Sequence, residues 1–212
     1  PLCVSSGVLR LVDARAGAAR PPQDNGAACR VAVEILSTGD SPNYHRVTAY
    51  PSTYKERWAH SMAARCGADG GRAIAAKMMR LQHSSDPVRL GSLTLAARDL
   101  RDAAVFQAAT RIARNPSVSV EARAFALRSL IWTLDPNVEV LYRGLIGLGG
   151  SVCPSGGRSE ARPPTGAPLP ADYREQIGEL VERLTGSTTE PASVRHAATC
   201  TGSVLALVRG RS

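Results

Sequence analysis

Aromatic residues, lysines and long apolar runs are all scarce in this chain of 212 residues. Aromatic residues make up only 4% of the sequence, so Ala, Leu, Val and Ile must supply most of any core, which argues against an aromatic-rich β-sandwich. No segment approaches the ~20 apolar residues of a membrane-spanning helix, so we expect no membrane span. Hydrophobic residues nevertheless reach 43%, which excludes a wholly disordered chain.

Only two of the 26 basic residues are lysines, Lys55 and Lys77. The remaining 24 basic residues are arginines, spread along the chain without a basic run. The formal net charge of +8 therefore indicates a diffuse, solvated charge and not a nucleic-acid-binding arm. A nucleic-acid-binding alternative requires six arginines to converge on one face: Arg65, Arg72, Arg80, Arg98, Arg111 and Arg114.

Sequence motifs of catalysis are also missing. The chain has no G-x-S-x-G elbow, no C-x-x-C or H-x-x-x-H pair, and no glycine-rich loop with the lysine of a phosphate site. His196 and Cys200 have the i, i+4 spacing of metal ligands, but a zinc site needs further ligands. We therefore expect no catalytic, cofactor-binding or metal-binding residue and a protein that is not an enzyme. Glu175, Glu179 and Glu182 are expected to form a solvated helix face.

The N-terminal 23 residues predict export. A mildly apolar stretch is followed by Ala14-Arg15-Ala16 and a proline-rich polar spacer, an arrangement that resembles the end of a signal peptide cleaved after Ala16. A frayed tail is the alternative. We expect residues 1–23 to be a signal remnant and flexible tail, and the protein to be periplasmic or secreted, with a cytoplasmic location as the alternative.

Five cysteines are present, and Cys3 would be removed with the signal peptide. The remaining four allow two disulfides in any of three pairings. Order along the sequence suggests Cys29–Cys66 and Cys153–Cys200. Four free, buried thiols are the alternative, and export favours the paired form.

Helical periodicity, with no sustained alternation of period two, predicts an all-α fold of roughly eight helices in antiparallel pairs. We expect an array over 24–148, a Gly/Pro-rich loop over 149–170 and a helix pair over 171–212. The helices are expected at 24–36, 53–67, 70–84, after Asp86-Pro87, 102–115, after Ser119 to 134, 171–186 and 190–208, with a shorter apolar segment at 138–150.

Each expected helix has an apolar stripe that should face the core. The stripes predicted by spacing are Ala28, Val31, Ala32 and Ile35; Tyr54, Trp58, Met62 and Cys66; Ile74, Met78 and Leu81; Val105, Ala108, Ala109 and Ile112; Ala122, Ala126, Ser129, Leu130, Thr133 and Leu134; Ile177, Leu180, Val181 and Leu184; and Val194, Ala197, Ala198, Thr201 and Leu205. The glycines of 67–71 and 147–150 are expected to end helices.

Three helix starts share a pattern. Each has an acid or amide, then proline, then a small residue followed by arginine: "DPVRLGSLTL", "NPSVSVEARAFALRSL" and "EPASVRHAATCTGSVL". This pattern resembles the HEAT-repeat family, well over 86–134 and less closely over 171–208. The resemblance implies a short, irregular α-solenoid in which Arg89, Arg123 and Arg195 bond backbone or acidic groups between repeats.

The function expected from this resemblance is that of a non-enzymatic scaffold for protein–protein interaction. Such a scaffold would bind its partner on a long surface of stacked helices. We expect a protein partner of unknown identity and no cofactor. A nucleic-acid-binding array with a basic concave face is the first alternative, and a lyase-like helper protein, as some HEAT-like proteins are, is the second.

Overall fold

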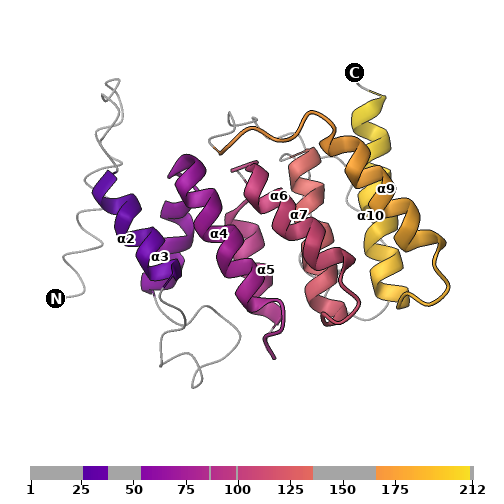
Figure 1. Cartoon of the computed structure of the whole chain (residues 1–212), viewed down its shortest axis with the longest axis horizontal. Coiled ribbons are helices and arrows are strands. Elements are labelled where there is room, and N and C mark those ends of the chain that lie inside the picture. The colour runs from indigo at the N-terminus through magenta and orange to yellow at the C-terminus, as the bar shows by residue number, and fades with distance from the viewer. Residues whose placement is uncertain (1–25, 38–53, 86, 99, 136–165, 211–212) are drawn as a thin grey trace.

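A computed structural model describes residues 26–37, 54–85, 87–98, 100–135 and 166–210 of the chain (Figure 1). These ranges contain helices and no strand, so the predicted all-α class is confirmed for them. The expected tail at 1–23, the segment at 138–150 and most of the 149–170 loop lie outside the described residues. The helices are α2 (Gly26–Ser37), α3 (Tyr54–Ala63), α4 (Gly67–Leu81), α5 (Pro87–Ala96), α6 (Ala103–Arg114), α7 (Val120–Leu134), α9 (Tyr173–Gly186) and α10 (Ala192–Arg209).

The helices contact one another in a regular order. Consecutive helices pair as α2 with α3, α4 with α5, α6 with α7, and α9 with α10. Contacts between pairs join α2 to α4, α4 to α6 and α6 to α9 in one layer, and α3 to α5, α5 to α7 and α7 to α10 in a second layer. Figure 1 shows the pairs side by side along the long axis of the molecule, with α2 and α10 at opposite ends.

Short polar side chains begin two central helices where the sequence predicts. Asp102 accepts hydrogen bonds from the backbone N–H groups of Ala104 and Val105 and so caps α6. Ser119 accepts one from Ala122 and caps α7. Proline is the first residue of α5, a position that has no hydrogen bond to lose. Local sequence therefore fixes these helix boundaries.

Small residues bring the helices close together in the core. A Cβ added at Gly91 of α5 would lie 2.6 Å from the Phe125 ring of α7, so only glycine permits this approach. The stripes predicted for α4, α6 and α10 are buried throughout, which confirms their registers, and in α9 Val181 alone of its stripe is only partly buried. The stripe predicted for α7 is buried as well.

The stripe predicted for α3 is displaced by one residue, and the stripe predicted for α2 is wrong at Val31, whereas its Ala32 is buried. Val31 of α2 is 47% exposed and Trp58 of α3 is 38% exposed. The buried positions are Ala32 and Leu36 in α2 and Ala59, His60 and Ala63 in α3. Alanine supplies most of the buried positions of these two helices, so Trp58 can face solvent although it is the largest apolar side chain of α3.

The glycines at 67–71 start a helix instead of ending one. Gly67 has a φ of 58°, which reverses the chain after Cys66, and α4 begins there. A Cβ at Gly70 would lie 1.8 Å from the carbonyl oxygen of Ala63, so the end of α3 crosses directly over the first turn of α4. The glycines therefore allow a tight corner between α3 and α4.

Helix α7 is buried on all sides and not only along a stripe. Every residue from Ala122 to Leu134 is buried, and α5, α6 and α10 all contact this helix. Its two internal arginines, Arg123 and Arg128, are each 2% exposed. A helix that is surrounded by three neighbours has no solvent face, and the periodicity of an amphipathic helix cannot reveal this.

The C-terminal end of the predicted loop is fixed in place by Asp102. The second oxygen of this carboxylate accepts a hydrogen bond of 2.6 Å from the backbone N–H of Ala167. The N–H of Ala103 in turn donates to the Ala167 carbonyl, and that of Gly166 donates to the Leu100 carbonyl. Residues 166–170 therefore pass along the start of α6 before α9 begins.

Candidate functional site

An ion pair joins α7 to the turn before α10. The guanidinium of Arg123 binds Glu190 through both nitrogens, with Nη1–Oε2 at 2.7 Å and Nη2–Oε1 at 2.8 Å. Its Nε donates to the carbonyl oxygen of Ala113 at the end of α6. One buried side chain thus links α6, α7 and the 187–191 turn, which we call the Arg123–Glu190 clamp.

Burial distinguishes this clamp from a surface ion pair. The side chain of Arg123 is 3% exposed and that of Glu190 is 17% exposed. The hydrogen bond from Arg123, together with the charges of Arg123 and Arg183, lowers the pKa of Glu190 and outweighs the opposing effect of burial. Glu190 is therefore a charged partner of Arg123, and the sequence analysis identified only the arginine.

The other two predicted repeat arginines have different surroundings. Arg195 donates from Nη1 to the carbonyl oxygens of Glu190 and Thr188, at 3.0 and 3.4 Å, so it holds the same turn from α10. Arg89 of α5 is 7% exposed, and burial lowers its pKa. Arg123 and Arg195 meet at Glu190, whereas Arg89 lies on another helix.

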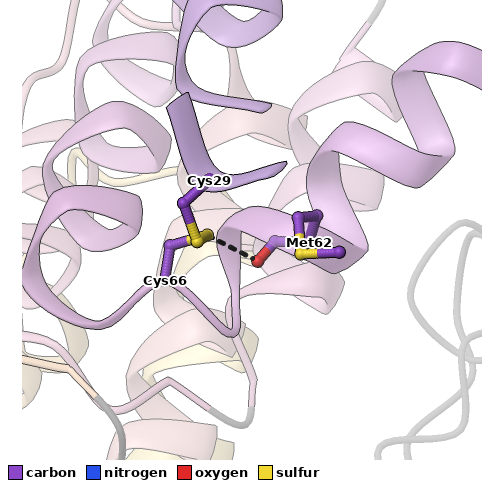
Figure 2. The surroundings of a disulfide bond; sticks show 3 residues. All are labelled: Cys29, Met62 and Cys66. Carbon is purple, nitrogen blue, oxygen red and sulfur yellow. Dashed lines mark hydrogen bonds between the residues drawn. A yellow bond between two sulfur atoms is a disulfide. The ribbon is translucent and has the colours of Figure 1, made fainter. Parts of the chain in front are cut away.

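The predicted disulfide Cys29–Cys66 is present. It joins α2 to the corner before α4, with a Cα–Cα distance of 5.6 Å across 37 residues of sequence (Figure 2). The carbonyl oxygen of Met62 lies 3.0 Å from Cys66 Sγ. Both cysteines are partly exposed, so this bond lies at the surface of the first helix pairs.

Cys200 also takes part in a disulfide, but Cys153 lies outside the described residues, so the pairing Cys153–Cys200 remains a prediction. Cys200 is 4% exposed, and its Sγ lies 3.7 Å from Nε2 of His196. A sulfur held in a disulfide is not a thiolate ligand for a metal, which agrees with reading this pair as a histidine beside a disulfide.

We also searched the described ranges for metal-binding groups and for membrane-spanning helices. Within them, no group of three or more His, Cys, Asp and Glu side chains is placed to hold a metal ion. No described helix is both long and apolar enough to cross a membrane.

The six arginines of the nucleic-acid alternative lie on several elements. Arg72 and Arg80 are on α4, and Arg111 and Arg114 are on the adjacent helix α6, all exposed. Arg65 lies in the corner after α3, and Arg98 follows α5. Arg72 pairs with Asp69, and Arg80 donates to the carbonyl oxygen of Leu36, so two of the arginines on these helices already have partners within the chain.

Comparison with known proteins identifies no relative. No protein-family model matches the chain, and neither the curated proteins nor the solved structures contain a significant match.

Proposed function

We propose that this chain is a non-enzymatic protein-binding module, built as a short α-solenoid of HEAT type and exported from the cytoplasm. The observation that carries the proposal is the order of helix contacts, in which each pair touches the next through both layers. Such stacking gives each helix pair neighbours that cover its apolar face, and it leaves long outer surfaces for a partner.

The clamp supports the same architecture. Arg123 belongs to one helix pair and Glu190 to the start of the last helix, 67 residues later. Thr201 of α10 adds a hydrogen bond of 3.3 Å from its hydroxyl to the Leu127 carbonyl of α7. Polar bonds between neighbouring pairs fix the angle at which they stack, and a fixed angle is what a rigid binding surface needs.

Export is supported by the cysteines. Disulfides persist in oxidising compartments and are rare in the cytosol. The Cys29–Cys66 bond and the oxidised state of Cys200 are therefore compatible with a periplasmic or secreted protein.

One observation favours the nucleic-acid alternative: four exposed arginines lie on the adjacent helices α4 and α6. Two of them are engaged by Asp69 and the Leu36 carbonyl, which leaves Arg111 and Arg114 as a small basic area. DNA affinity comes mainly from the number of phosphates that basic side chains neutralise, so this small area gives little support to the alternative.

The test is a binding experiment with the full, oxidised chain. Proteins captured from the secreted or periplasmic fraction are purified and titrated against it by calorimetry, and we expect one of them to bind saturably. The same chain is mixed with a labelled DNA duplex at low and high salt, with the double variant Arg111→Glu/Arg114→Glu as the control. Salt-dependent DNA binding that this variant abolishes, without a protein ligand, would reject the proposal in favour of the alternative.

A further inference from the structure

The disulfide cysteines of this chain differ in how exposed they are. Cys29 and Cys66 are both partly exposed, whereas Cys200 is 4% exposed. Thiol–disulfide exchange begins when a thiolate reaches a sulfur atom, so exposure controls its rate. A small thiol in solution therefore reaches the sulfurs of Cys29 and Cys66 more readily than the sulfur of Cys200.

The helix that this bond holds is the first of the described helices. Among the described helices, α2 contacts α3 and α4. Its fully buried side chains are Ala32 and Leu36, both in its second half, and Arg80 binds the Leu36 carbonyl at the same end. Cys29 lies in the first half of the helix, where no side chain is fully buried, so the disulfide adds a tether at the end of α2 that is less buried.

We propose that the Cys29–Cys66 bond is a redox-sensitive tether, and that its reduction by a low-molecular-weight thiol of the glutathione class releases α2 while the rest of the array stays folded. The release uncovers the surfaces of α3 and α4 against which Ala32 and Leu36 pack. This property belongs to the disulfide and does not depend on the proposed binding function.

The surroundings of the bond indicate which sulfur is attacked. The Met62 carbonyl oxygen, 3.0 Å from Cys66 Sγ, repels an incoming thiolate there, so the thiolate attacks Cys29 Sγ (Figure 2). The S–S bond breaks, a mixed disulfide forms at Cys29, and Cys66 departs as a thiolate. Cys66 is the N-cap residue of α4, so the departing thiolate lies beside the N–H groups of the first turn, which favour a negative charge and oppose the repulsion by the Met62 carbonyl oxygen.

A second thiolate completes the reduction. It attacks the external sulfur of the mixed disulfide, releasing the Cys29 thiolate and the oxidised dimer of the small thiol. Both cysteine thiolates then take a proton from water. The resulting Cys66 thiol can donate to the Met62 carbonyl, which keeps the corner between α3 and α4 in place after α2 is free.

The experiment titrates the oxidised full chain with mixtures of reduced and oxidised glutathione, followed by alkylation, peptide mapping and hydrogen exchange. We expect Cys29 and Cys66 to become alkylated under conditions that leave Cys200 protected, with glutathione trapped on Cys29. Amides of α2 should exchange on the order of 100-fold faster after reduction, and those of α7 and α10 should change little.

The variant Cys29→Ser/Cys66→Ser provides the matched control. It should show fast exchange of α2 without any thiol, and added thiol should have no further effect on α2. Simultaneous reduction of Cys66 and Cys200, or unchanged exchange of α2 in the reduced wild-type protein, would overturn the tether. Glutathione trapped on Cys66 would overturn the order of attack.

Discussion

The Cα of Gly71 in α4 lies directly against the carboxylate of Asp102 at the start of α6. A Cβ at position 71 would lie 2.1 Å from Cγ of Asp102, closer than any real contact. Asp102 is 2% exposed and cannot move away without losing its bonds to Ala104, Val105 and Ala167. One glycine and one acid therefore set how closely α4 and α6 approach.

Replacing this glycine should destabilise the protein. We expect Gly71→Ala to lower the free energy of unfolding by about 1–3 kcal/mol, because the new methyl group overlaps a carboxylate held by three backbone N–H groups. The measurement is chemical denaturation followed by circular dichroism. The matched control is Gly186→Ala at the end of α9, where a Cβ meets nothing within 4 Å and should leave stability unchanged or raise it. Equal effects of the two variants would contradict the close approach.

Asp102 should matter more than an ordinary helix cap. Asp102→Ala removes the cap of α6, worth about 1 kcal/mol, and also leaves the Ala167 N–H without its acceptor, at a further cost of about 1–3 kcal/mol. Ser119→Ala removes only the cap of α7 and serves as the comparison. We expect the first variant to lose clearly more stability in thermal unfolding, and to expose residues 166–170 to proteolysis. Similar losses in both variants would show that the bond to Ala167 contributes nothing.

The Arg123–Glu190 clamp should make stability depend on pH in the acidic range. The folded-state pKa of Glu190 lies below its ordinary value of 4.5, so its contribution is present above that value and is lost as pH falls through the lower folded pKa. Glu190→Gln should destabilise the protein at pH 7, since Arg123 remains buried with a weaker partner. Removal of one partner of a buried pair costs about 3–5 kcal/mol, and we expect the lower part of this range because Glu190 is partly exposed.

The measurement for the clamp is the difference in unfolding free energy between wild type and Glu190→Gln from pH 2 to pH 7. This difference should shrink below pH 4.5. Glu182→Gln, on the exposed side of α9, should change stability by less than about 0.5 kcal/mol at any pH in that range. A difference that does not depend on pH would contradict an ionised, paired Glu190.

The buried surface of α7 around Ala126 should not tolerate a carboxylate without a partner. Ala126 is 0% exposed, so Ala126→Asp buries a carboxylate without a partner and should unfold at least the central helices. Circular dichroism and thermal melting detect this loss. Ala206→Asp, on the exposed side of α10, introduces the same residue and should keep the wild-type melting temperature. Wild-type melting of Ala126→Asp would contradict the burial of Ala126 in α7.

Much of the fold could be predicted from local sequence. Helix caps such as Asp102 and Ser119, and proline at the start of α5, act within one turn, so their effects can be read from neighbouring residues. The pairing Cys29–Cys66 followed from cysteine order. The resemblance to HEAT repeats pointed to Arg123 as a residue that bonds neighbouring helices, but its acidic partner Glu190 lies 67 residues away, with no sequence signal that links the two.

By itself, the sequence determined where most helices begin and end, and which side of α4, α6, α9 and α10 is apolar, because both depend on hydrogen bonds and spacing within one or two turns. Only the tertiary structure decided what each helix packs against. It buried α7 on every side between neighbours, and it turned Trp58 outward while Ala59 and Ala63 faced the core. Close packing of helices through small residues depends on how well the side chains fit together as well as on their hydrophobicity. Which side chains of a helix are buried therefore depends on atoms far away in the chain.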